Sequence, residues 1–331
     1  MPYSSGLEVV TCSSLPGDAR EDRVYRLEPS HTDRAYYQER IDRNIGWITR
    51  EEQDLLERSV VGIAGCGGMG GLLASIFLRL GVGEVRIADC EVFDISNINR
   101  QFAAGRETVG KSKAFETARM IRAITDDTTL VVYPQGISPA TATPFLEGCD
   151  IVCDEIEFWA VGARILLHEW AQQLGVPLIN CSTVGFGTRL FLFDHRGMDM
   201  GTMFGLSLRE AGELQQRIQA RTATKDEVRR VMNSVLRALI PEVPEYGLPA
   251  DSYRSAEVSV RRLLEESRAP IIATNPPLAS GFAADHTLLA LLQKNGVPRN
   301  IVRPPKTPGY LYFDAALMRA QAVERTEVSH E

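Results

Sequence analysis

The sequence predicts an α/β fold: a Rossmann-like, mostly parallel sheet with helices on both faces, antiparallel additions and a helical crossover segment. A β-branched, apolar run over 60–65 leads into a glycine turn, and a helical pattern over 69–80 follows it. A second apolar run over 84–89 ends on an acidic residue, Asp89. Strands that alternate with helices of this length are typical of parallel sheets.

Downstream, the alternation continues. Three further strands are expected at 129–133, 150–154 and 177–181, with helices at 111–123 and 160–174. Upstream, Thr49 and Glu52 have the spacing of a capping box and predict the start of another helix.

The sequence predicts fewer strands in the second half of the chain than in the first. The run 188–194 alternates weakly and is expected to add an antiparallel strand, and 309–314 alternates aromatic residues as a closing strand. Residues 200–268 show helical spacing interrupted by prolines. This segment is either a lid or substrate groove, or a structural helical insertion.

These elements divide the chain into four parts. We expect an N-terminal arm (1–48), a nucleotide-binding core (49–195), a helical crossover or substrate segment (196–275), and a C-terminal helix with a closing strand of the same domain (276–331).

Composition limits the classes of function. Apolar residues make up 44% of the chain, enough for a packed core, and the formal net charge of −7 makes nucleic acid an improbable partner. The sequence has no run of apolar residues long enough for a membrane span, and its N-terminus lacks the pattern of a secretory signal. With six cysteines expected to be reduced, we predict a cytoplasmic location.

The glycine turn is the first candidate binding element. Its G-x-G-x-x-G spacing lets the backbone approach a phosphate at a helix N-terminus, and Asp89 follows at the position that binds a ribose. The glycines are Gly65, Gly67, Gly68 and Gly70. This signal alone fits any nucleotide-binding α/β domain.

A polar cluster after the second strand narrows the interpretation. Arg100 and Lys113 carry positive charge, and Asn97 and Gln101 add amides. A dinucleotide has only two phosphates, whereas a triphosphate attacked at its α-phosphorus develops charge that such groups stabilise. The cluster therefore favours a triphosphate.

These motifs together resemble the ThiF/MoeB/HesA family, the bacterial relatives of ubiquitin-activating enzymes. The turn reads GCGGMG, Asp89-Cys90-Glu91 follows, then SNINRQ over 96–101, and GKSK over 110–113. Upstream, RIDRN over 40–44 resembles the family's R-x-x-R-N/Q element.

The resemblance implies ATP-dependent adenylation of a carboxylate, usually the C-terminus of a peptide or small protein. It implies that Asp89 binds the ribose, and that Asn97, Arg100, Gln101 and Lys113 surround the phosphates. Arg43 would be an arginine finger, which in this family commonly comes from the other subunit of a homodimer.

The chain departs from the family pattern at the metal-binding acid. Glu157 falls on the position of the usual aspartate, and Phe158 replaces an asparagine. A glutamate can still hold Mg²⁺. Asp154 is the alternative ligand.

The cysteines differ from the family as well. No pair is spaced C-x-x-C, so we predict no zinc, and no cysteine follows Cys181. Because thioester-forming relatives keep a cysteine beyond that point, we expect direct transfer of the acyl group from the adenylate to a nucleophile. Arg189 is a further candidate for substrate contact.

Two alternatives remain open. An NAD-dependent oxidoreductase would explain the turn and Asp89, but it leaves Arg100 and Lys113 without a role. A non-catalytic subunit of a heterodimeric activating enzyme would explain Glu157 and the missing cysteine.

Overall fold

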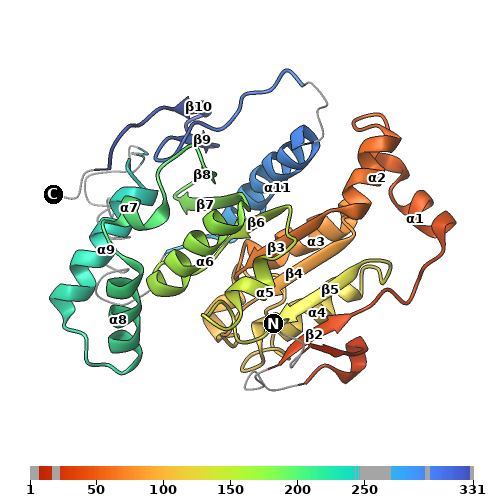
Figure 1. Cartoon of the computed structure of the whole chain (residues 1–331), viewed down its shortest axis with the longest axis horizontal. Helices are drawn as coiled ribbons and strands as arrows, with labels where there is room; N and C mark the ends of the chain where they lie inside the picture. The colour runs from red at the N-terminus through yellow and green to blue at the C-terminus, as the bar shows by residue number, and fades with distance from the viewer. Residues whose placement is uncertain are drawn as a thin grey trace.

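The computed structural model describes residues 7–16, 23–242, 244, 246, 270–294 and 299–328. Its described strands form one ten-stranded sheet in the order β1-β2-β5-β4-β3-β6-β7-β8-β9-β10, with helices on both faces (Figure 1). The predicted fold class is confirmed.

Five parallel strands form the centre of this sheet. They are β5 (Thr129–Tyr133), β4 (Glu84–Ala88), β3 (Val60–Ala64), β6 (Ile151–Asp154) and β7 (Leu178–Val184). Their side chains are buried almost throughout, as expected for strands covered on both faces. Because the strands are parallel, their carboxyl ends meet at one edge, where the polar residues of the sequence motifs follow them.

Shorter strands extend the sheet on both sides. At one side β8 (Gly187–Phe193), β9 (Tyr310–Asp314) and β10 (Arg319–Val323) continue antiparallel from β7. At the other side β2 (Val24–Leu27) pairs antiparallel with β5, and β1 (Leu7–Val9) pairs with β2. The expected antiparallel additions therefore lie next to β7 and close the sheet.

One face of the sheet is covered by α3 (Gly70–Leu80), α4 (Lys113–Arg122) and α11 (Asn275–Lys294). Their buried faces, including Phe77 and Phe115, pack on Ile63 and Ile87 of the central strands. Since α3 begins where the glycine turn ends, this packing fixes the direction in which its N-terminus points.

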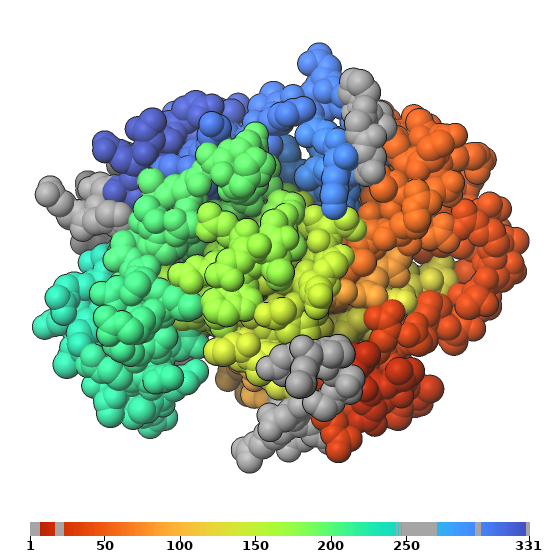
Figure 2. Space-filling model, viewed as in Figure 1, coloured from red at the N-terminus to blue at the C-terminus, as the bar shows by residue number. Residues whose placement is uncertain are grey.

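The other face carries α5 (Ala142–Leu146), α6 (Val161–Leu174), α7 (Met200–Phe204), α8 (Leu208–Gln219) and α9 (Lys225–Leu239). Helices α7, α8 and α9 come from the predicted crossover segment, and Figure 2 shows them as a lobe beside α6. Capping boxes at Ser207 and Thr224 start α8 and α9. Residues 243, 245 and 247–269 of that segment lie outside the described residues.

The N-terminal region packs at the far end of α3. It contains the short helix η1 (Cys12–Ser14), α1 (Arg34–Arg40), the short helix η2 (Asp42–Asn44) and α2 (Arg50–Arg58), which starts with the predicted capping box. The Tyr37 hydroxyl donates to the Gly81 carbonyl, and the Asn44 amide donates to the Leu80 carbonyl. The predicted arm is thus tied to the C-terminal end of α3.

Several described elements were not expected from the sequence, among them α1, β2, α5 and β10. None of the helices in the described ranges is both long and apolar enough to cross a membrane.

Candidate active site

The glycine turn is held against the end of β6. Gly65 has a φ of +105°, and a side chain there would overlap the carbonyl oxygen of Glu155. A side chain on Gly70 would overlap the carbonyl oxygen of Gly65. Both positions therefore require glycine, and the first turn of α3 is left with backbone N–H groups that can face an anion.

Asp89 follows β4 and binds the turn. Its Oδ2 accepts the backbone N–H of Cys66 at 2.7 Å, and its Oδ1 accepts that of Glu91 at 2.8 Å. Burial raises the pKa of Asp89, and the nearby ammonium of Lys113 offsets only part of this effect. The carboxylate thus lies beside the turn, where the sequence placed the ribose contact.

Lys113 is the first residue of α4 and is only 3% exposed. Its Nζ lies 2.6 Å from Oε2 of Glu91. Burial opposes its charge, but Asp89 and Glu91 outweigh burial and raise the pKa of Lys113. The side chain is therefore a buried ammonium held among acidic groups.

The loop that follows β4 carries the other three predicted residues. A short helix, η3 (Ile95–Asn97), orients the loop, and Oδ1 of Asn97 accepts the backbone N–H of Asp94 at 3.0 Å. Arg100 donates to the Ser96 carbonyl and to Oδ1 of Asn99 through Nη1. Gln101 is 3% exposed, and its Oε1 has no hydrogen-bond partner in the structure as described.

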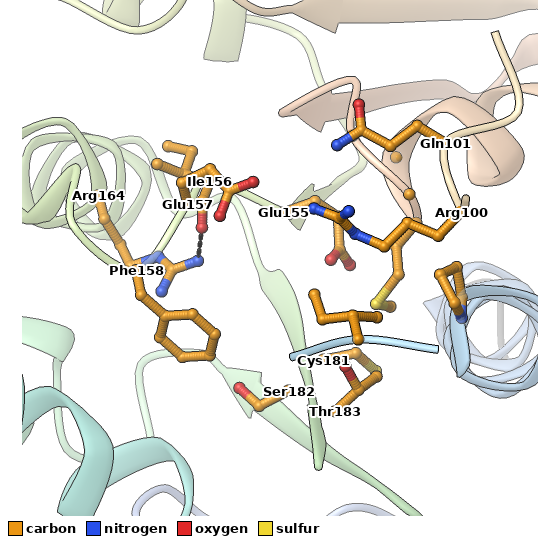
Figure 3. Close-up of a pocket in the computed structure, with 16 residues that line it drawn as sticks. Arg100, Gln101, Glu155, Ile156, Glu157, Phe158, Arg164, Cys181, Ser182 and Thr183 are labelled. Atoms are coloured by element: carbon orange, nitrogen blue, oxygen red, sulfur yellow. Dashed lines mark hydrogen bonds between the residues drawn. The ribbon is translucent and has the colours of Figure 1, made fainter. Parts of the chain in front are cut away.

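Two adjoining pockets open at this edge of the sheet. The outer pocket runs beside the loop after β4, and its lining includes Cys90, Glu91, Asn97, Arg100, Lys113, Glu157 and Ile271. The inner pocket lies between the glycine turn and the end of β7, and its lining includes Gly67, Gly68, Gly70, Arg100, Gln101, Glu155, Glu157, Arg164, Cys181, Ser182, Thr183 and Ile271 (Figure 3). Arg100, Glu157 and Ile271 line both pockets. The structure thus brings all the predicted site residues that follow β3 and β4 to the same edge of the sheet.

The two acidic residues predicted as metal ligands have different surroundings. Glu157 lines both pockets, and its carboxylate has no hydrogen bond or ion pair with any residue of the described ranges. Burial and the charge of Glu91 raise its pKa, with Lys113 and Arg100 opposing them. The carboxylate therefore has no protein partner among the described residues.

Asp154, in contrast, is fully buried and already has partners. Its Oδ2 lies 3.0 Å from Nε of Arg164 and 2.9 Å from Nε2 of His168, and its Oδ1 accepts the backbone N–H of Ile156 at 3.1 Å. Burial alone would raise the pKa of Asp154, but Arg164 and His168 lower it below its usual range. Both carboxylate oxygens are thus committed to protein groups.

Arg43 lies away from these pockets. It sits on η2, beside the C-terminal end of α3, whereas the pockets lie at the N-terminal end of that helix. A helix of this length spans about 16 Å. Arg40, the first residue of the same motif, binds Asp127 and the Leu78 carbonyl and so anchors the arm.

The remaining candidates are buried or peripheral. Cys181 is buried in the inner pocket, where burial raises the pKa of its thiol well above the ordinary value, while Cys90 is exposed at the outer pocket. Arg189 is 1% exposed in β8 and lies over the Tyr312 ring at 4.8 Å. Within the described residues, no group of three or more His, Cys, Asp or Glu gathers that could hold a metal ion, and the absence of zinc stays a prediction.

Sequence reasoning missed Arg164. It lines the inner pocket from α6, and its ion pair with Asp154 joins α6 to the end of β6. Arg164 and His168 stand one helical turn apart, which places both on the helix face toward Asp154. That spacing was the available signal, but only the fold brings Asp154 opposite it.

The fold and this site define a nucleotide-binding α/β protein with a cluster of cationic and amide groups beside the glycine turn. The chain belongs to the ThiF family, whose model matches residues 41–330. The resemblance seen in the motifs is therefore confirmed.

The comparisons also found known proteins with a similar sequence or a similar fold. The adenylyltransferase and sulfurtransferase MOCS3 of Sus scrofa is 28% identical over 58% of this chain and 43% of its own length. The chain thus spans less than half of this relative. PaaA has the same fold, with a TM-score of 0.55 at 16% identity over 88% of this chain and 87% of PaaA. Escherichia coli MccB, solved with ATP, gives a TM-score of 0.52 at 16% identity over 82% of this chain and 65% of MccB.

Proposed function

We propose that this chain is an ATP-dependent adenylyltransferase. In the proposed reaction, a carboxylate oxygen of the substrate attacks the α-phosphorus of ATP, the bond to the bridging oxygen breaks, and pyrophosphate leaves. The name of the MOCS3 relative and the ATP in the MccB structure support this activity.

The buried ammonium of Lys113 is the observation that carries the proposal. It lies in a pocket shared with Arg100, and two acidic neighbours, Asp89 and Glu91, keep it charged. A cation kept charged in a site of low exposure stabilises the charge that develops on a triphosphate more than it would in water. A nicotinamide cofactor gives this group no role, which disfavours an oxidoreductase.

The donor set fits magnesium. Glu157 would hold the ion, because its carboxylate has no partner among the residues described, and Mg²⁺ needs only one or two carboxylates besides phosphate oxygens. The ion would neutralise charge on the phosphates when bound. We prefer Glu157 to Asp154, whose oxygens are already used by Arg164, His168 and Ile156.

A homodimer would bring Arg43 to the site of a partner subunit. Its position at the far end of α3 argues against a role in its own chain. Beside it Trp47 is 87% exposed, and the loop at the outer pocket exposes Ile95 (73%) and Phe102 (52%). Large exposed apolar side chains of this kind favour a protein interface.

We further propose that the acyl group is the carboxylate of a peptide or small protein, and that it passes directly from the adenylate to a nucleophile. MccB has been solved with MccA bound, a precedent within the same fold. The thiol of Cys181 is buried and has a raised pKa, so it is a poor nucleophile for a thioester step. Pro270, Ile271 and Ile272 of the crossover segment line the outer pocket, so this part of the segment would then contact the substrate.

The test is ATP–pyrophosphate exchange with the purified chain and a panel of peptides that carry free C-termini. We expect exchange in the wild type and a loss of at least about a hundredfold in Lys113→Ala. Lys294→Ala is the matched control, because this lysine pairs with Asp150 outside both pockets. NADH binding in place of ATP binding would favour the oxidoreductase, and ATP binding without any exchange would favour the non-catalytic subunit.

A further inference from the structure

The inner pocket contains a guanidinium with one unused nitrogen. Arg164 is only 4% exposed. Its Nε binds Asp154 and its Nη2 donates to the Ile156 carbonyl, while its Nη1 has no hydrogen-bond partner in the part of the chain that the structure describes. A buried donor without a partner is costly, so an oxygen of a bound ligand that accepted its hydrogen bond would be stabilised.

The orientation of this guanidinium is fixed by its neighbours. The Asp154 pair and the Ile156 bond hold two of its three nitrogens, and the Phe158 ring lies 5.8 Å away under its plane (Figure 3). Because Asp154 already balances its charge, Nη1 adds a directed hydrogen bond without adding net charge to the pocket. Such a group suits an uncharged carbonyl oxygen as well as a carboxylate.

The pocket around Arg164 differs from its neighbour. Lys113 belongs to the outer pocket, whereas the inner pocket is lined by the glycine turn, the end of β7 and Arg164. In Figure 3, Arg164 lies on the side of the inner pocket opposite Arg100 and Gln101. The two pockets meet at Arg100 and Glu157, so reactants bound in each would meet there.

We propose that the part of the inner pocket between Arg164 and the end of β7 is the subsite for the reacting carboxylate of the acyl substrate, and that Nη1 of Arg164 donates to one of its two oxygens. This inference rests on the adenylyltransferase function proposed above. The other oxygen attacks the α-phosphorus and forms the new P–O bond, and the electron pair of the broken bond leaves with pyrophosphate. The oxygen bound to Arg164 becomes the carbonyl oxygen of the acyl-adenylate, so the same hydrogen bond serves substrate and product, and no proton moves.

The test compares two probes by calorimetry with the full chain: 5′-O-sulfamoyladenosine and 5′-O-(N-acetylsulfamoyl)adenosine, which differ by one acyl group. We expect the acetylated compound to bind the wild type about tenfold more tightly, the effect of one hydrogen bond to a charged group. In Arg164→Lys this gain should disappear, while the affinity for the compound without the acyl group stays within about twofold. Arg86→Lys is the matched control, since Arg86 also joins a carboxylate to backbone carbonyls but lies outside both pockets.

A second variant covers the case in which Arg164→Lys fails to fold. Thr183 lines the inner pocket and has no side-chain hydrogen bond to another described residue, so Thr183→Leu fills the pocket without breaking the Asp154 pair. Thr183→Leu should abolish the tighter binding of the acetylated compound. It should leave the affinity for the compound without the acyl group unchanged. The inference is overturned if the wild type shows no acyl gain, or if the variants weaken both probes equally. Failure of both probes and of ATP to bind the wild type would instead contradict the proposed function.

Discussion

Asp154 and Arg164 form a buried ion pair at the end of β6, with 3.0 Å between Oδ2 of the acid and Nε of the guanidinium. His168 adds a hydrogen bond to the same oxygen. Since Arg164 also binds the Ile156 carbonyl, the pair fixes the short turn between β6 and Glu157. This ion pair, which stabilises the fold, therefore lies directly beside the proposed metal ligand, Glu157, and beside the inner pocket.

The first prediction concerns the stability that this pair gives. Asp154→Asn should lower the free energy of unfolding by about 3–5 kcal/mol at pH 7, because it leaves a buried guanidinium without its charge partner. The pKa of Asp154 is lower in the folded state, so its stabilisation is present above the unfolded pKa of about 3.9 and is lost as the pH falls through the folded value.

Urea denaturation at pH 7 and at about pH 3.5 measures this difference, which should shrink at the lower pH. Asp226→Asn, at an exposed position in the first turn of α9, is the control and should change stability by less than about 0.5 kcal/mol. An equal loss at both pH values would contradict the role of the ionised carboxylate.

The second prediction compares two glycines. Gly70→Ala should destabilise the chain and weaken ATP binding, because its Cβ would overlap the Gly65 carbonyl oxygen and displace the turn. Gly212→Ala should stabilise the chain by up to about 1 kcal/mol, since its Cβ would meet open space within α8. Thermal melts and ATP titrations of the two variants check this. Unchanged ATP binding in Gly70→Ala would mean that the turn does not contact the nucleotide.

Sequence patterns predicted the parts of the molecule whose causes are local. The β-branched run at β3, the glycines that its turn requires and the capping box at Thr49 each determine their own element, and all lie where expected. Strand β10 was missed because its side chains are mostly exposed and two of its five residues are alanines, which have low strand propensity, so its pairing with β9 leaves no strand pattern. Helix α5 was missed because it has only five residues and contains Pro144.

In the site, too, the sequence predicted the residues whose positions have local causes. Asp89, Arg100 and Lys113 follow strands that the sequence identifies, and parallel pairing brings them together. The roles of Arg164 and Asp154 depend on the distance between α6 and β6, which no spacing in the sequence encodes. The proposed role of Arg43 would depend on contacts with a partner subunit, so neither spacing nor the fold of one subunit assigns it.

The third prediction tests the metal ligand. Glu157→Gln should weaken ATP binding by at least about tenfold with Mg²⁺ present and leave it nearly unchanged in EDTA, because the amide keeps the shape but loses the charge that binds the ion. Calorimetric titration under both conditions measures this. Glu147→Gln, at an exposed position before β6, is the control. A loss of equal size in EDTA would show that Glu157 acts on the nucleotide or the fold and not on magnesium.

The fourth prediction tests direct transfer. Cys181→Ala and Cys90→Ala remove the two thiols that line the pockets, and both variants should keep pyrophosphate exchange within about twofold of the wild type. Intact-protein mass spectrometry after incubation with ATP and the peptide panel should find no adduct that a thiol reagent releases. An adduct lost in either variant would establish a thioester and overturn direct transfer.

The fifth prediction tests whether Arg43 acts in the partner's site. Arg43→Ala and Lys113→Ala should each abolish exchange alone, but an equal mixture allowed to exchange subunits should recover about a quarter of the wild-type rate. Half of the dimers are then mixed, and in each mixed dimer one site has both its own lysine and an intact arginine from the other chain. Mixing Lys113→Ala with Arg100→Ala is the control and should recover nothing, because both residues line the outer pocket of their own chain. No recovery in the test mixture would place Arg43 outside the partner's site, and recovery in the control would mean that Lys113 and Arg100 do not act in the same chain.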